Sequence, residues 1–278
     1  MINMQSYFFV PASKLNKLAD ISKKGVGEMI IDFEDAILSS EKEKYFETLK
    51  TLSNLKDYWF RVPLRGTFNE EISYDFILKL NSIGAVKIIL PKLKSAEELI
   101  DVLNTFSKNK FILLIEHPRL LIEIKNAIIN NPIMISSLNG LGLGSHDLMA
   151  FLEAKHSEPQ LDYPRKELLY IAKAYNLKAI DIASMNIFDK LTFMEEVQYG
   201  MDNGYDAKFL IHPNQITWFD EQLKQNEILV NWAQNVLDHL PKNYNGDSIV
   251  PFILNEEVIE KPHAMRALEI IRKNRDGK

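Results

Sequence analysis

The sequence contains no cysteine, and this absence excludes several classes of protein at once. A disulfide scaffold, a catalytic thiol, an iron–sulfur cluster and a cysteine-ligated zinc all require that residue. Basic residues are not in excess either, because 33 lysines and arginines face 38 acidic residues and leave a formal net charge of −5. The two signs are interspersed, so we expect no nucleic-acid partner.

Long hydrophobic runs and a basic N-terminal segment are also lacking. Purely apolar stretches such as residues 111–115 are far too short to span a bilayer, so we expect no membrane association. No basic residue precedes Lys14, which is unlike the start of a secretory signal peptide. These features together predict a cytoplasmic protein.

The overall composition is that of a folded chain. The 278 residues are 46% hydrophobic and 26% charged, which is typical of a soluble globular protein and not of a disordered one. A chain of this length suits one large domain or two small ones, and it can bury a sizeable core.

Eight short runs of strand-forming residues recur at fairly even intervals. Most are nearly continuous in apolar residues, which is typical of strands buried on both faces. Segments with helical periodicity lie between them, and Ser95 with Glu98 has the spacing of a capping box at one helix start. The runs are residues 6–10, 29–33, 58–62, 86–90, 111–115, 138–143, 178–182 and 208–211.

Eight strands that alternate with helices over about 220 residues predict an α/β fold, the (β/α)8 TIM barrel, whose usual size is about 250 residues. The alternative is a doubly wound sheet, which usually has fewer strands and a glycine-rich first turn. Here the first run ends in Pro11, Ala12 and Ser13 instead. The barrel is therefore favoured.

The pattern changes after about residue 217. We therefore divide the chain into a barrel, residues 1–217, and a C-terminal helical and hairpin extension, residues 218–278. Residues 249–254 and 257–260 have the pattern of a short hairpin around Asn255 and Glu256. Pro262 then suits the first turn of a last helix.

Acidic residues stand where the strands of such a barrel would end at their carboxyl side, which is where reacting groups project. Glu34 and Asp35 follow the second run, Glu116 follows the fifth and Asp147 follows the sixth. Like charges are costly to bury together, and a hard divalent cation with oxygen ligands would compensate them. We interpret Glu116 and Asp147 as sharing one Mg²⁺. The alternative for each acid is a helix N-cap or a salt-bridge partner.

Arg61 lies in a strongly apolar strand and needs an anionic partner if it is buried. One interpretation pairs it with Glu34 or Asp35. In the other interpretation its guanidinium donates paired hydrogen bonds to a substrate carboxylate or to an enolate oxygen. Its place in the same ring as the acids favours the second interpretation.

Taken in order along the chain, these motifs resemble the citrate lyase beta subunit-like family. That family belongs to the HpcH/HpaI aldolase group, and the malyl-CoA lyases are relatives. The match covers nearly the whole chain and is specific for the superfamily, although not for one substrate. It is carried by residues 9–11, 31–36, 61–62, 90–92, 95–98, 115–116, 143–148, 179–181, 208–215, 262–263 and 266–267.

The resemblance implies a (β/α)8 barrel whose extension reaches a neighbouring subunit, usually in a homotrimer. It implies Mg²⁺ held by Glu116 and Asp147, with Arg61 binding the oxo-acid or oxyanion. Glu34 and Asp35 would support the metal waters and the catalytic centre. The activity implied is reversible carbon–carbon cleavage, typically on CoA or acyl-carrier thioesters of 3-hydroxy acids.

Further positions acquire expected roles from the same resemblance. Pro91, Gly144 and Ser145 fall among the substrate contacts, and Lys14 follows the first strand at the place expected to bind the cofactor thioester. Glu260 matches a position where relatives usually carry an aspartate that transfers a proton in the adjacent subunit. Glutamate keeps that charge but moves it outward by one methylene.

Other departures from the family lie among the positions that are expected to contact the thioester. Gln5 stands before the first strand, where relatives carry an arginine. The arginine–valine–asparagine pattern of the third strand is here Arg61, Val62 and Pro63. The metal and enolate residues are therefore kept while their surroundings differ.

Three hypotheses about function follow. The leading one is a Mg²⁺-dependent carbon–carbon lyase acting through an enolate on a 3-hydroxyacyl-CoA-type thioester, because a cation and an arginine can stabilise the charge that develops on the oxygen. A second is an aldolase on a free 2-oxo acid, such as pyruvate or oxaloacetate adducts. A third is a non-catalytic barrel subunit or ligand sensor.

Overall fold

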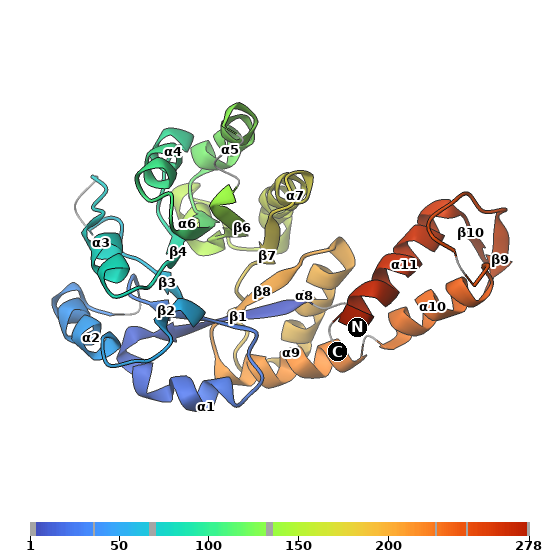
Figure 1. The fold of residues 1–278 in the computed structure, drawn as a ribbon, viewed down its shortest axis with the longest axis horizontal. Coiled ribbons are helices and arrows are strands. Elements are labelled where there is room, and N and C mark those ends of the chain that lie inside the picture. Colours follow the sequence, from blue (N-terminus) through green and yellow to red (C-terminus); the bar gives the residue numbers. More distant parts are fainter. Residues whose placement is uncertain are drawn as a thin grey trace.

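The computed structural model describes residues 4–35, 37–66, 71–131, 136–225, 227–242 and 244–276. Eight parallel strands form a closed barrel in the order β1 to β8, and β8 pairs back with β1. Helices surround the barrel, and a helical arm extends away from it (Figure 1). The predicted (β/α)8 barrel is confirmed, and closure excludes the doubly wound sheet, which has two open edges.

Each of the eight predicted runs overlaps one strand of the barrel. A two-stranded hairpin follows in the arm, at the predicted place. The strands are β1 (Gln5–Pro11), β2 (Glu28–Asp32), β3 (Trp59–Arg61), β4 (Lys87–Leu90), β5 (Lys110–Ile115), β6 (Leu138–Leu143), β7 (Lys178–Asp181), β8 (Ala207–Leu210), β9 (Phe252–Leu254) and β10 (Glu257–Ile259).

Helices follow the strands in the order that a right-handed βα barrel requires. Short 3-10 segments, η1 (Ala12–Lys17), η2 (Ser39–Glu41) and η3 (Leu55–Asp57), stand in connections near the first three strands. The α-helices are α1 (Leu18–Ser22), α2 (Lys42–Leu49), α3 (Asp75–Ser82), α4 (Ala96–Thr105), α5 (Pro118–Asn130), α6 (Ser145–Phe151), α7 (Glu158–Ala174), α8 (Lys190–Asn203), α9 (Pro213–Gln225), α10 (Glu227–Asp238) and α11 (Lys261–Asp276).

Strand side chains fill two separate apolar layers, because successive residues of a strand point to opposite faces. Residues such as Ile30, Ile112 and Phe209 fill the barrel interior, while their neighbours pack outward against the helices. Both faces are therefore buried, which explains the nearly continuous apolar runs. The N-cap expected at Ser95 is also present at the start of α4, since the Ser95 hydroxyl accepts a hydrogen bond from the backbone N–H of Glu98.

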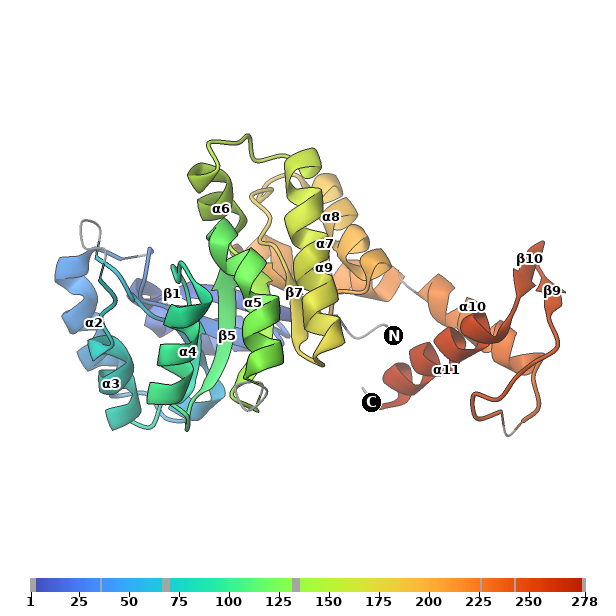
Figure 2. The ribbon, with the colours of Figure 1, turned by 90° about the horizontal axis from the view of Figure 1, so that it is seen from above.

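The arm has a core of its own. Ala233 and Val236 of α10 pack with Ile259 of the hairpin and with Ala267 and Ile271 of α11. Figures 1 and 2 show these elements projecting from the side of the barrel. Residue 217 lies within α9, and the change of core comes between α9 and α10. The domain boundary placed at residue 217 stays a prediction.

Within the described ranges, none of the helices combines the length and the apolar character needed to cross a bilayer.

Candidate active site

The carboxyl ends of the strands gather most of the predicted site residues around one cavity of about 310 Å³. Parallel strands in a closed barrel all end on the same side, so residues far apart in sequence meet there. The polar residues that line this cavity are Asp32, Asp35, Arg61, Glu116, Ser145, His146 and Asp147, together with Gly144. Apolar side chains line the rest, among them Phe9, Leu114 and Phe209.

Arg61, at the end of β3, is held by three carboxylates. Its Nε and Nη2 atoms donate to the two oxygens of Asp32 at 2.8 and 2.6 Å. Its Nη1 atom lies 3.1 Å from Glu34 and 3.5 Å from Asp35. The salt bridges considered from the sequence therefore exist, and Asp32 is an additional partner that the sequence did not indicate. The guanidinium still borders the cavity, with the ring of Phe9 5.0 Å away.

Lys92 is a residue that sequence reasoning missed. It follows β4 with a φ of +56°, a left-handed conformation that is uncommon for residues other than glycine. This turn directs its backbone N–H to Glu116, which accepts at 2.6 Å. Its Nζ atom lies 2.7 Å from Glu34 and 2.9 Å from Asp35. A lysine at a strand end beside several acids was the signal that could have identified it.

Glu116 is buried, and its surroundings do not balance the negative charge of its ionised form. Burial raises its pKa well above the usual range, and the charges of Glu34 and Asp147 raise it further, against the opposing effects of the Lys92 N–H and Arg61. Burial likewise raises the pKa of Glu34 to about 7, although Arg61 and Lys92 lower it. A site with this excess of negative charge favours a bound cation.

The donor set also fits the expected metal. Among the described residues no cluster of three or more histidine, aspartate and glutamate side chains is arranged to hold a metal ion. Glu116 and Asp147 nevertheless line the same cavity. Mg²⁺ commonly takes one or two protein carboxylates and fills its other positions with water and substrate oxygens. Two carboxylates bordering open space therefore suit Mg²⁺ better than a metal that needs a closed protein cage.

Gly144 has a steric role beside Glu116. A methyl group on Gly144 would lie 2.8 Å from Cδ of Glu116 and closer still to its Cγ. Only glycine leaves room for the carboxylate at this turn between β6 and α6. Gly144 therefore shapes the acidic pair whether or not it also contacts substrate.

A second cavity of about 590 Å³ adjoins the first, and both are lined by Asp35, Glu116 and Asp147. Cationic residues also line this second cavity, namely Lys42, Arg65, Lys92 and Lys94. The acidic pair thus borders both a smaller cavity and a larger one that has more cationic residues. Such an arrangement can receive a ligand with a small reacting end and an anionic remainder.

Three predicted site residues, all described by the structure, lie outside the walls of both cavities. Pro91 is buried just after β4, and Lys14 is exposed on η1. Glu260 is exposed between the hairpin and α11, in the arm. Its backbone N–H donates to Nδ1 of His263 at 3.1 Å, which places it at the start of that helix.

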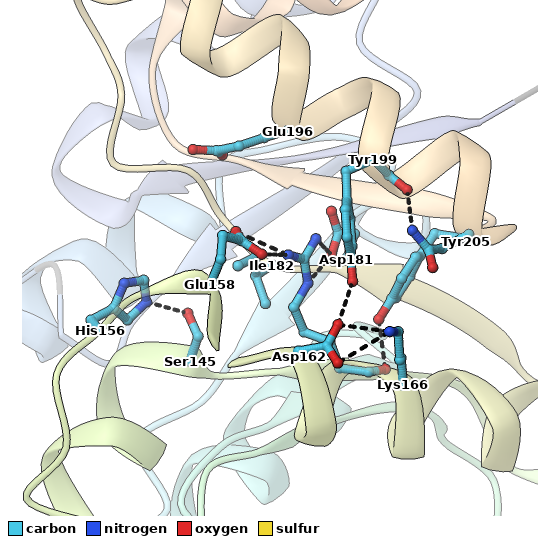
Figure 3. Close-up of polar contacts among 12 residues, drawn as sticks. Ser145, His156, Glu158, Asp162, Lys166, Asp181, Ile182, Glu196, Tyr199 and Tyr205 are labelled. Carbon is cyan, nitrogen blue, oxygen red and sulfur yellow. Dashed lines mark hydrogen bonds and ion pairs between the residues drawn. The ribbon is translucent and has the colours of Figure 1, made fainter. Parts of the chain in front are cut away.

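Ser145 is the first residue of α6, and its hydroxyl meets a histidine that sequence reasoning did not single out. The Oγ atom lies 3.0 Å from Nε2 of His156, in the connection between α6 and α7 (Figure 3). The ring of His156 stacks on that of His146, with centroids 3.9 Å apart and an angle of 6° between the planes. Nothing in the local sequence pattern indicated this pairing, because the tertiary path of the connection produces it.

Comparison with known proteins agrees with the geometry. A family model described as HpcH/HpaI aldolase/citrate lyase matches residues 5–213. The mitochondrial citramalyl-CoA lyase of Homo sapiens is 25% identical over 257 residues, which is 85% of this chain and 75% of that protein. The citrate lyase subunit beta of Leuconostoc mesenteroides subsp. cremoris is 24% identical over 286 residues, which is 96% of this chain and 92% of that protein.

A solved structure is similar over almost its whole length. It is the protein CitE from Mycobacterium tuberculosis in complex with magnesium, acetoacetate and coenzyme A. The TM-score is 0.78 at 21% sequence identity, and the alignment covers 98% of each chain. This likeness shows that the two proteins share a fold.

Proposed function

The chain belongs to the HpcH/HpaI aldolase/citrate lyase family, and from this premise we propose that it is a Mg²⁺-dependent carbon–carbon lyase. Its substrate would be a 3-hydroxyacyl thioester of the CoA type, cleaved reversibly through an enolate. The observation that carries the proposal is the buried Glu116, which shares one cavity with Asp147 and Arg61.

Glu116 and Asp147 would hold the metal, and the bound cation would supply positive charge to the oxygen of the developing enolate. The backbone N–H of Lys92 fixes one oxygen of Glu116 and so sets the direction of its carboxylate. Glu34 and Asp35 each contact both Arg61 and Lys92, so they would hold these two cations beside the metal.

Arg61 would place a permanent positive charge beside the reacting oxygen. Asp32 fixes the plane of the guanidinium, so this charge needs little reorganisation when substrate binds. Gly144 and Ser145, which line the cavity, would face the substrate, and the buried Pro91 would only support the wall from behind. Lys14 would contact the cofactor part of the thioester.

Glu260 is proposed to act in a neighbouring subunit. In the direction of cleavage its carboxylate would take the proton of the substrate hydroxyl. Within its own chain it stands in the arm, outside the walls of both cavities. This position supports a role for the arm outside its own barrel. We further propose that the protein is a cytoplasmic homotrimer in which each arm closes over the next barrel.

A free 2-oxo acid is the second candidate substrate. The cavity that contains Arg61 is small, about 310 Å³, and Lys14 does not line it. Calorimetric titration of the Mg²⁺-loaded protein with acetyl-CoA and with pyruvate would separate the two candidates. Binding of acetyl-CoA with little binding of pyruvate favours the thioester, and the reverse result favours the free acid.

The metal assignment is tested by titrating Mg²⁺ into the wild type and into Glu116→Gln and Asp147→Asn. We expect both substitutions to abolish measurable binding, because each removes one of only two protein ligands. Asp20→Asn, which alters an exposed acid on α1, is the matched control. Unchanged Mg²⁺ affinity in a folded Glu116→Gln protein would refute the assignment.

A further inference from the structure

The second cavity gathers four cationic side chains from the segments that follow β2, β3 and β4. Its volume is about 590 Å³, against about 310 Å³ for the first cavity, and Asp35, Glu116 and Asp147 line both. A ligand that reacts in the first cavity can therefore extend into the second. The four cations are Lys42 of α2, Arg65 after β3, and Lys92 and Lys94 after β4.

Lys42 carries a charge that the protein itself does not compensate. Its ammonium group forms no hydrogen bond or ion pair within the part of the chain that the structure describes. Burial lowers the pKa of this half-buried lysine, although the charges of Glu34 and Asp35 raise it without an ion pair. Lys42 is also the first residue of α2, the end of a helix at which a positive charge is unfavourable. A bound anion would compensate both effects.

The wall beside Lys42 is held in place by contacts between the connections after β3 and β4. The Nε atom of Arg65 donates to the backbone carbonyl of Lys92 at 2.9 Å, and its Nη2 atom pairs with Glu98. The backbone N–H of Lys94 donates to the other oxygen of Glu98 at 2.6 Å. These bonds join the two connections, so this part of the wall is fixed before a ligand binds.

The charges along the second cavity suit a doubly charged anion. Four carboxylates line it beside the four cations, so the wall by itself is balanced when all of these groups are ionised. A Mg²⁺ ion held by Glu116 and Asp147, as proposed above, would add two positive charges. A dianion would restore neutrality in this partly buried site, whereas a neutral ligand would leave the excess charge without a partner.

The kind of cation favours a phosphate over a carboxylate. Bidentate recognition of a carboxylate needs the paired N–H groups of an arginine. Arg65 is the only arginine among the described residues that line this cavity, and its Nε and Nη2 groups already contact Lys92 and Glu98. A lysine acts as a point charge and is a common ligand of phosphate groups. The uncompensated Lys42 therefore suits a phosphate.

We propose that the second cavity binds a phosphate group carried by the acid part of the substrate, with Lys42 supplying the charge that holds it. The substrate would then be a hydroxy acid that carries a phosphate ester, which stays intact during the reaction. Carbon–carbon cleavage at the other end of this substrate rests on the proposed function. The phosphates of the cofactor are the alternative source, but Lys14, which is proposed to contact the cofactor, does not line this cavity.

Calorimetric titration with 3-phosphoglycerate and with glycerate tests the proposal, because these two hydroxy acids differ only in the phosphate group. The full-length protein is used at saturating Mg²⁺. We expect 3-phosphoglycerate to bind roughly 10-fold more tightly than glycerate, the contribution of one hydrogen bond to a charged group. Equal affinities for the two acids would overturn the proposal. No turnover is needed, so the result does not depend on whether the chain is a lyase.

Lys42→Gln should lower the affinity for 3-phosphoglycerate by roughly 10-fold and leave the affinity for glycerate unchanged. Lys44→Gln is the matched control and should bind both acids as the wild type does, because this exposed lysine of α2 does not line the cavity. Circular dichroism checks that each variant is folded. An equal loss of affinity for both acids in Lys42→Gln would show that the lysine does not recognise the phosphate, and the proposal would be wrong.

Two further titrations separate this proposal from those around it. If Lys42→Gln weakens the binding of coenzyme A as strongly as that of 3-phosphoglycerate, the cavity serves the cofactor and the assignment to the acid fails. With a chelator present, the ratio of 3-phosphoglycerate affinities between the wild type and Lys42→Gln should persist, because the charge of Lys42 does not depend on the metal. A ratio that persists in a protein that binds no Mg²⁺ would refute the metal assignment alone.

Discussion

Arg61 and Asp32 stand opposite one another on β3 and β2 and are joined by two parallel hydrogen bonds of 2.8 and 2.6 Å. The pair lies at the carboxyl end of the barrel, where the Arg61 and Asp32 side chains are 14% and 4% exposed. A guanidinium held in this way has a fixed plane, so its remaining edge can only face Glu34, Asp35 and the cavity.

Asp32→Asn should therefore destabilise the protein. Removal of one partner from a buried ion pair costs about 3 kcal/mol, because the remaining charge is left desolvated. Glu34 and Asp35 offset part of this cost, since both still face Arg61. Urea unfolding measures the change, with the exposed Asp20→Asn as control. An equal free energy of unfolding for the two variants would contradict the structural importance of the pair.

Gly144→Ala should weaken Mg²⁺ binding without removing a ligand. The added methyl group would overlap the side chain of Glu116 and displace its carboxylate from the position that it now holds. Calorimetric titration with Mg²⁺ measures the effect. Gly84→Ala is the control, because nothing lies within 4 Å of its added methyl group, although its φ of +81° adds backbone strain. If both variants kept wild-type affinity, the steric argument would be wrong.

The stability of the metal-free protein should depend on the ionisation of Glu34. Its pKa is raised from 4.5 to about 7 in the folded state, so the folded state binds the proton more tightly than the unfolded state does. The stabilising contribution is then complete below about pH 4.5 and is lost as the pH rises through about 7.

Glu34→Gln, which mimics the protonated side chain, checks this dependence. We expect the wild type to lose stability relative to Glu34→Gln between about pH 5 and about pH 8, in urea unfolding with a chelator present. A stability difference between the two proteins that stays constant over that interval would show that Glu34 does not titrate there.

Mixed oligomers test whether Glu260 acts in a neighbouring subunit. Glu116→Gln removes the barrel site of its own chain, and Glu260→Gln removes the carboxylate of the arm. If the arm of one subunit serves the barrel of the next, co-expression of the two variants creates some sites with both groups intact. We expect lyase activity above the sum of the two separate proteins. Activity no greater than that sum would place Glu260 outside the site or within its own chain.

The fold was predictable because it depends on local pattern. Eight apolar runs separated by helical segments require strands covered on both faces, and a closed parallel barrel satisfies that requirement without open edges. The hairpin around Asn255 and the cap at Ser95 were predictable for the same reason, since each depends on residues adjacent in sequence. The placement of Glu116 and Asp147 beside one cavity followed from strand order alone.

Other features required the tertiary structure, because they depend on distances between elements that the sequence does not encode locally. The pairing of Arg61 with Asp32 depends on the register between β2 and β3. The contact of the Lys92 N–H with Glu116 depends on a left-handed backbone conformation at Lys92, which no residue pattern in the sequence indicated. The approach of His156 to Ser145 depends on the path of a connection after α6. The sequence thus determined the scaffold and which acidic residues reach its rim, while packing decided which partners those side chains meet there.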